Sequence, residues 1–220
     1  MKKIVVLIFV IIYSCLSDKD EIKISGKISG LNNSTIYLVK VDENIVLDSS
    51  KVVDEKVNLT AYINEPLELA LRIESKNSTK SYSFFSEPSS KLIFTSSKEK
   101  FEYNGKIENS VMNSEYYKLK TQIEKYDEKD LELLADQIKF SVEGDQKNYN
   151  LIEEKRIKIN QKKILLIVNY SINNNSSPLS AFIVFKYKES INENYLEKIY
   201  ANFSDELKDS YYAKKIISTP

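Results

Sequence analysis

A period of two runs through residues 22–28, which read Ile-Lys-Ile-Ser-Gly-Lys-Ile, because an apolar residue or a glycine stands at every second position. This alternation is typical of a β-strand that buries one face. Similar runs recur about every ten residues with polar turns between them, which is typical of an antiparallel sandwich or barrel. We therefore predict an antiparallel β-sandwich-like domain over residues 22–105. The further strands expected in it are Ile36–Leu38, Ile45–Val53, Val57–Ile63, Leu67–Ile73, Tyr82–Phe85, Lys91–Thr95 and Phe101–Tyr103.

The period changes after Gly105, where apolar residues begin to recur at helical spacing. Gly144-Asp145 is the expected break between two long helices, and Ser177-Pro178 is typical of a helix N-cap followed by proline in the first turn. Two shorter helices are expected at Glu193–Phe203 and Asp205–Lys215. The sequence thus predicts an α+β protein whose helical domain, residues 106–220, packs against the sheet domain. The apolar positions that predict the long helices are Tyr116, Leu119, Ile123, Leu131, Leu134, Ile138, Ile157, Ile164, Leu165, Val168 and Ile172.

The N-terminus has the pattern of a bacterial export signal. Two lysines precede an apolar run that is shorter than the roughly 20 residues needed to span a bilayer, and Ser14 comes directly before Cys15. We expect residues 1–14 to be a signal peptide and Cys15 to be the lipidation site, followed by a linker over residues 15–21. The expected location is the cell envelope, with the protein anchored in the outer membrane through lipid on Cys15. Periplasmic and surface-facing positions both remain open.

The composition excludes several classes of function. The 220 residues include no histidine, which excludes Ser-His-Asp and Cys-His catalysis and HExxH zinc sites. Four glycines form neither type of phosphate-binding loop, and no Asp-x-Asp-x-Asp-Gly calcium loop is present. The formal net charge is zero and only two basic residues are arginine, so no nucleic acid partner is expected. We expect no cofactor and no metal.

Several stretches together resemble a known module. They are Ile24–Leu31, Ser34–Leu38, Leu47–Val52, Phe84–Pro88, Asn104–Ser110, Ser177–Ala181 and Leu207–Tyr212. This chain resembles the N-terminal domain of unknown function, of the 4369 type, that many Bacteroidota lipoproteins have ahead of a thioredoxin-like domain. Glu55 and Val57 depart from that pattern, since relatives tend to have Gly and Phe there. The resemblance extends over nearly all of the expected mature chain.

The resemblance implies an assembly role without redox chemistry. Relatives that are redox-active would use a Trp-Cys-x-x-Cys site, whereas this chain has no tryptophan and one cysteine, and it ends at Pro220, where a thioredoxin-like domain would begin. In longer relatives the module would hold a redox domain away from the membrane and contribute to dimerisation. We therefore expect a non-catalytic binding or assembly module, with a thioredoxin-like envelope protein, another protein or a second copy as the partner.

Other functions remain open on particular residues. Carbohydrate binding at the outer membrane would use exposed tyrosines as stacking platforms, whereas core packing is the alternative use of such residues. A carboxylate-dependent hydrolase would need two carboxyl groups about 5–10 Å apart in one pocket, and the candidate pairs are Glu153-Glu154 and Asp127/Asp130. The basic cluster Lys155–Lys163 is either a patch for an acidic lipid or partner, or a solvated helix face. A truncated relic without a role is the last alternative. The tyrosines in question are Tyr116, Tyr117, Tyr195, Tyr200, Tyr211 and Tyr212.

Overall fold

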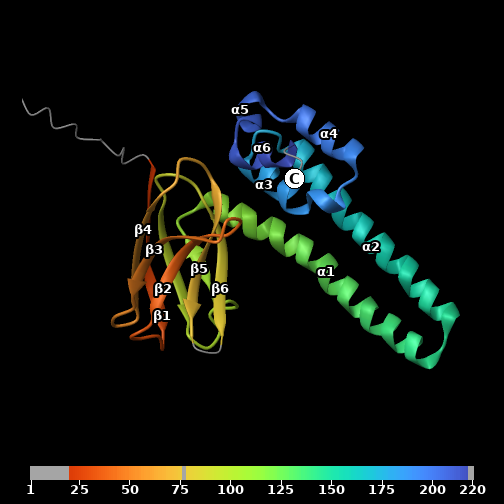
Figure 1. Ribbon diagram of the computed structural model, residues 1–220, viewed down its shortest axis with the longest axis horizontal. Coiled ribbons are helices and arrows are strands. Elements are labelled where there is room, and N and C mark those ends of the chain that lie inside the picture. Colours follow the sequence, from red (N-terminus) through yellow and green to blue (C-terminus); the bar gives the residue numbers. More distant parts are fainter. Residues whose placement is uncertain (1–19, 76–77, 218–220) are drawn as a thin grey trace, which may run out of the picture.

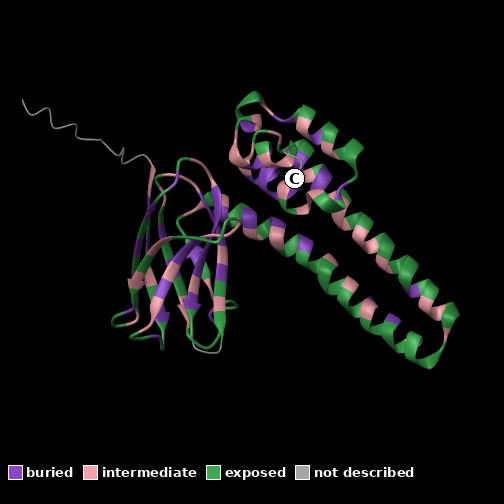
Figure 2. Ribbon diagram, viewed as in Figure 1, coloured by how far each residue is buried: buried purple, intermediate pink, exposed green. Residues whose placement is uncertain are grey.

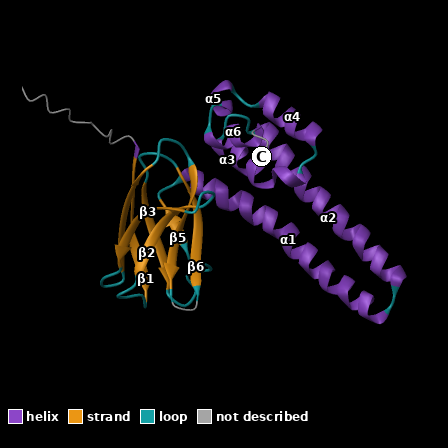
Figure 3. Cartoon of the chain, in the orientation of Figure 1, coloured by secondary structure: helices purple, strands orange, loops and turns teal. Residues whose placement is uncertain are grey.

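The computed structural model describes residues 20–75 and 78–217. In these residues a β-sandwich is followed by a helical region (Figure 1; Figure 3), and the predicted α+β class is confirmed. The expected signal peptide and Cys15 lie outside the described residues. The strands are β1 (Glu21–Ser29), β2 (Thr35–Lys40), β3 (Ile45–Lys51), β4 (Lys56–Tyr62), β5 (Leu67–Glu74), β6 (Thr79–Ser86), β7 (Lys91–Ser97) and β8 (Lys106–Glu108).

The strands form two four-stranded sheets, with the orders β4-β1-β7-β8 and β3-β2-β5-β6. Neighbours within each sheet are antiparallel, except that β1 and β7 run parallel, which departs from the arrangement expected. An alternating pattern does not reveal this, because side chains alternate in both kinds of pairing. β1 approaches β7 closely at Gly26, where a Cβ atom would lie 1.8 Å from the backbone oxygen of Phe94. A residue with a side chain would therefore push these two strands apart.

The last predicted strand is wrong. Phe101–Tyr103 lies in turns, and β8 follows it at Lys106–Glu108, beyond the expected domain boundary. Phe101 is buried because its ring packs edge-on against Phe94, whereas Tyr103 is 88% exposed. In the sequence, two aromatic residues two positions apart imitate one face of a strand. In the structure, only one of them faces the core.

The long helices are predicted correctly. The left-handed Gly144 (φ 72°) ends the first helix, and the Asp145 side chain accepts a hydrogen bond from the Asn148 N–H to start the second. At about 1.5 Å per residue, the 33 residues of the first helix extend about 50 Å. The helices are α1 (Val111–Glu143), α2 (Gln146–Asn173), α3 (Pro178–Tyr187), α4 (Glu193–Asn202), α5 (Asp205–Lys208) and α6 (Tyr211–Ile217), with a 3-10 turn, η2, at Lys188–Ser190.

The final predicted helix, Asp205–Lys215, is two helices, α5 and α6. Ser210 separates them, because its hydroxyl donates to the Leu207 carbonyl at the end of α5 and accepts from the Ala213 N–H in α6. A serine hydroxyl competes in this way with the regular helical hydrogen bonds. None of the helices in the described residues is long and apolar enough to cross a lipid bilayer.

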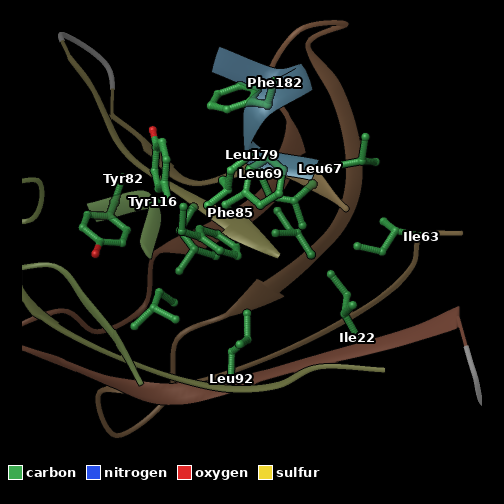
Figure 4. Close-up of a cluster of buried hydrophobic side chains, with 14 of the residues drawn as sticks. Ile22, Ile63, Leu67, Leu69, Tyr82, Phe85, Leu92, Tyr116, Leu179 and Phe182 are labelled. Carbon is green, nitrogen blue, oxygen red and sulfur yellow. The ribbon is translucent and has the colours of Figure 1, made fainter. Parts of the chain in front are cut away.

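One hydrophobic core extends from the sandwich into the helices (Figure 2). β5 is buried on both faces, since α1, α3 and α6 cover the side of its sheet that faces away from the sandwich. Phe85 on β6 lies at the centre of this contact, with ring centroids 5.1 Å from Phe182 and 6.2 Å from Tyr116 (Figure 4). The expectation that the helices pack on the sheet is therefore confirmed.

Candidate functional site

A buried carboxylate lies where the sheet meets the helices. Glu68 on β5 is 6% exposed, and its Oε1 accepts from the Tyr116 hydroxyl at 3.0 Å and from Lys186 Nζ at 3.1 Å. Its backbone N–H donates to the Tyr212 hydroxyl at 3.0 Å. Burial, followed by the nearby charge of Glu68, raises the pKa of Tyr116 well above its usual value, so Tyr116 stays a neutral donor. These contacts connect β5 to α1, α3 and α6.

A second polar group, the Tyr211 cluster, connects α6 to the loop between β2 and β3. The Tyr211 hydroxyl donates to Asp42 and to Glu43, and Lys215 Nζ lies 3.0 Å from Asp42 Oδ2. Burial of Asp42 opposes its ionisation, but the hydrogen bonds from Tyr211 and Lys215 outweigh this and hold the pKa of Asp42 below its usual 3.8. Together with Glu68, the Tyr211 cluster explains how the sandwich and the C-terminal helices are held as one body.

The tyrosines considered for sugar stacking are mostly used in this contact. Tyr116 and Tyr212 are 3% and 2% exposed, and Tyr117 and Tyr211 are partly buried beside them. Tyr195 on α4 is 39% exposed, whereas Tyr200 on the same helix is partly buried against the core. Tyr116, Tyr117, Tyr211 and Tyr212 therefore supply packing and hydrogen bonds between sheet and helices, and these four form no exposed row for a sugar.

The outer edge of the sandwich at β6 is covered by side chains. The backbone N–H groups of Ser81 and Phe85 donate to Glu102 Oε1 and Asn113 Oδ1, and the Ser83 carbonyl accepts from the Tyr117 hydroxyl. Three backbone groups that point away from the sheet thus have side-chain partners. Such partners block the pairing of another strand at an open edge.

The α1–α2 hairpin extends beyond the sandwich on the side of the molecule away from β4 (Figure 1). A polar network holds its two helices together. Arg156 on α2 binds both carboxylate oxygens of Asp130 on α1, at 2.9 and 3.0 Å, and donates to Gln137 at 2.7 Å. Asn160 also donates to Asp130. The hydrogen bond from Arg156 holds the pKa of Asp130 below its usual value, so this carboxylate stays ionised at neutral pH.

The carboxylates considered for hydrolysis are therefore placed next to cations. Asp130 binds Arg156, and Asp127 lies 2.7 Å from Lys163 Nζ. Glu153 and Glu154 are exposed on α2. The pKa of Asp130 is lowered, whereas a general acid needs a raised pKa. No cluster of acidic residues able to hold a metal ion is found among the described residues. Part of the basic cluster thus binds α1 rather than an external ligand.

Apolar side chains are exposed on this same hairpin. Leu131, Ile138 and Val142 on α1 are 67%, 56% and 83% exposed, and Ile157 and Leu165 on α2 are 53% and 43% exposed. We call these five residues the hairpin strip. Four of them belong to the apolar positions that predict the helices, so part of that helical pattern faces solvent in the distal hairpin, whereas Tyr116, Ile123 and Val168 of the same pattern are buried. Contiguous exposed apolar surface of this kind marks interaction sites.

Three residues of the hairpin strip, Leu131, Ile138 and Ile157, lie on one side of the hairpin. Asp130 and Gln137 on α1 contact Arg156 and Asn160 on α2, so these residues mark the line where the helices meet. Antiparallel helices turn in opposite senses when viewed from one end. Residues that directly follow the contact residues therefore project to the same side of both helices. Leu131 follows Asp130, Ile138 follows Gln137 and Ile157 follows Arg156.

A groove of about 750 Å³ adjoins the hairpin strip. It runs along α2 past Ile157, Ile164 and Leu165 to Tyr195 on α4, and Gln137 of α1 also lines it. The groove therefore connects the two α2 residues of the hairpin strip to α4, across polar as well as apolar side chains. Sequence periodicity indicated these residues, but a helical pattern alone does not say whether its apolar side meets this chain or a partner.

Comparison with known proteins identifies the family. No significant match is found among curated proteins or among solved structures. The model of a domain of unknown function, DUF4369, matches residues 22–163, which include the sandwich, α1 and the first part of α2. The matched segment is more than half of the chain. It contains four of the five residues of the hairpin strip, because Leu165 lies beyond its end. The chain therefore belongs to the DUF4369 family, whose function is unknown.

Proposed function

We propose that this protein is a non-catalytic lipoprotein of the cell envelope, attached to its membrane through Cys15, and that its folded part acts as a binding or assembly module. The observation that supports this proposal is the hairpin strip. Its five apolar residues lie on a projecting hairpin and are 43–83% exposed. Burying such side chains against a partner is favourable by roughly 25 cal/mol per Å².

The arrangement of the two regions suits a module of this kind. Glu68 and the Tyr211 cluster hold the sandwich to the C-terminal helices, while the hairpin extends from this base with its apolar side uncovered. A lipid on Cys15 would attach the chain at the start of the sandwich, since β1 begins at Glu21. The hairpin would then be presented to other envelope proteins. A thioredoxin-like envelope protein is the partner that the resemblance suggests.

Crosslinking in the native host tests the proposal. Tagged full-length chain is crosslinked in vivo, and captured proteins are identified by mass spectrometry. A matched pair of variants is compared with the wild type. Ile138→Glu places a charge in the hairpin strip, where Ile138 is 56% exposed, and Val111→Glu places one at another exposed apolar position (77%) at the start of α1. Capture that is lost in Ile138→Glu and kept in Val111→Glu supports the proposal.

Capture that survives Ile138→Glu would place the binding surface elsewhere, and enrichment of glycan-uptake components by both variants would favour carbohydrate binding. Capture of no protein above an unrelated lipoprotein control would contradict the proposal. Lipidation is tested separately with Cys15→Ser, which is expected to leave the chain unlabelled by a fatty-acid analogue. If the wild type also remains unlabelled, the anchor is wrong.

A further inference from the structure

We propose that the partner of the hairpin strip is a second copy of this chain, and that two hairpins pack side by side as a four-helix bundle. In this dimer α1 of each copy lies over α2 of the other. The inference rests on the proposed function, because it names the occupant of the same surface. It depends on three features of the hairpin: its charge distribution, its size and its placement on the fold.

The two helices of the hairpin have opposite charge in its distal part. Residues 124–143 of α1 contain seven Asp or Glu and three Lys, a net charge of −4. Residues 146–165 of α2 contain six Lys or Arg and two Glu, a net charge of +4. The pairs Asp130–Arg156 and Asp127–Lys163 are made within the hairpin, which leaves −2 on α1 and +2 on α2 to face a partner. Two such hairpins attract one another when the acidic helix of each faces the basic helix of the other, and they repel when like helices face.

This charge pattern selects one two-fold arrangement. A two-fold axis parallel to the hairpin places α1 of one copy over α2 of the other, with both tips at the same end. A two-fold axis across the hairpin places α1 over α1 and α2 over α2, with like charges together. Only the first arrangement is complementary, and it is isologous, since each contact occurs twice. It also places both sandwiches at the same end, as attachment of both copies to one membrane requires.

Charged residues beside the hairpin strip fit the same arrangement. Glu128 lies one turn before Leu131 on α1, and Lys158 directly follows Ile157 on α2. Both side chains are exposed, and neither takes part in the Asp130–Arg156 pair. When α1 faces the partner's α2, an apolar centre is flanked by an acidic rim on one helix and a basic rim on the other. This is the usual anatomy of a paired-helix interface.

The available surface is large enough for a stable dimer. Residues 124–143 extend about 30 Å, and two helices of about 10 Å diameter lie side by side. A face of these dimensions is comparable with the roughly 800 Å² per partner of a specific interface. Antiparallel helix pairs that pack through apolar side chains at interaxial distances of about 8–10 Å form four-helix bundles of this kind.

Disulfide crosslinking between two tagged full-length copies tests the arrangement. Asp130 contacts both Arg156 and Asn160, so Leu131 and Ile157 lie at the same height along the hairpin. In the proposed dimer, Leu131→Cys in one copy meets Ile157→Cys in the other. Oxidation of the co-expressed pair is expected to give heterodimer at least tenfold above the background of the wild type, which retains Cys15. Two copies of Leu131→Cys are expected to stay near background.

Sedimentation of the full-length chain in detergent supplies a second measurement. The wild type is expected to dimerise, and the double variant Leu131→Glu/Ile138→Glu is expected to raise the dissociation constant on the order of 100-fold, with Val111→Glu unchanged. Because these residues are largely exposed, circular dichroism of the variants is expected to match the wild type.

A monomeric wild type, or a Leu131–Ile157 crosslink no stronger than background, would overturn the dimer. If Ile138→Glu nevertheless abolishes capture of a different envelope protein in the native host, the binding function stands and only its occupant is wrong. If neither copies nor other proteins are captured, both proposals fail.

Discussion

The contact between sandwich and helices differs from the distal hairpin in how each is held together. At the contact, Phe85 and Phe182 are 0% and 2% exposed, and polar groups such as Glu68 are enclosed by aromatic rings. In the distal hairpin, Arg156, Asp130 and Gln137 form a polar link between the helices. Leu133 and Ile152 are buried there, while the five residues of the hairpin strip face solvent. Apolar burial is the dominant stabilising term in folding, so we expect the contact to be the more stable region and the hairpin to gain stability from the proposed partner.

The largest loss of stability is expected for a substitution at the contact between the sandwich and the helices. Phe85→Ala removes a fully buried ring that packs on Phe182 and Tyr116, and it is expected to lower the free energy of unfolding by about 3–5 kcal/mol. Chemical denaturation followed by circular dichroism measures this. Tyr103→Ala, at a position 88% exposed, is the control and should be nearly neutral. Equal effects of the two substitutions would show that the contact is not the stable region.

The second-largest loss of stability is expected for Glu68→Ala, at the same contact. The substitution leaves the buried Tyr116 hydroxyl without its acceptor and removes the partner of Lys186, so a loss of about 2 kcal/mol is expected. Thermal unfolding measures it, with Glu189→Ala on the exposed η2 turn as a control. A melting temperature like that of the wild type would mean that water or rearrangement satisfies these groups, and that the polar part of the contact adds little.

In the distal hairpin, the substitution that removes the polar link between the helices is Arg156→Ala. Loss of the two bonds to Asp130 and the bond to Gln137 is expected to destabilise the distal hairpin by about 1–2 kcal/mol while the sandwich stays unchanged. Amide hydrogen exchange resolves the two regions, and it should accelerate within residues 126–160 alone. Lys155→Ala, the exposed neighbour, should leave exchange as it is. Acceleration throughout the chain would show that hairpin and contact unfold together.

The smallest expected effect depends on pH. Asp42 has a lowered pKa in the folded protein, so its contribution is complete above its unfolded value near 3.8 and is lost as pH falls through the lowered value. Tyr211→Phe removes a donor to Asp42 and should cost about 1 kcal/mol at pH 7. The difference in melting temperature from the wild type should shrink toward pH 2, whereas Tyr195→Phe should show no such change. A difference that stays constant with pH would contradict the role of Asp42.

The local signals in the sequence predicted most of the elements. Period-two runs gave seven of the strands, and Gly144-Asp145 marked the turn between the long helices because its backbone and capping requirements are local. The parallel pairing of β1 with β7 was not predictable, because it joins residues far apart in the chain. Phe101 was misread because burial in a turn and burial in a strand give the same pattern.

Only part of the candidate site could be predicted from the sequence. The hairpin strip was visible as apolar residues at helical spacing, but the sequence does not tell an internal face from an external one. The pairing of Arg156 with Asp130 needs the register of two antiparallel helices, which their separate patterns do not define. Glu68 gave no signal at all, because a glutamate within an apolar strand is ordinarily the sign of an exposed face.

The side chains that cover the β6 edge bear on whether neighbouring copies can aggregate through that edge. Lipid-attached proteins share a thin layer at the membrane, where local concentration is high and open strands can join into aggregates. An approaching strand would have to displace Glu102, Asn113 and Tyr117 before forming its first backbone bond with β6. Under the lipid attachment proposed for this chain, copies would therefore meet at this edge without joining into an extended sheet.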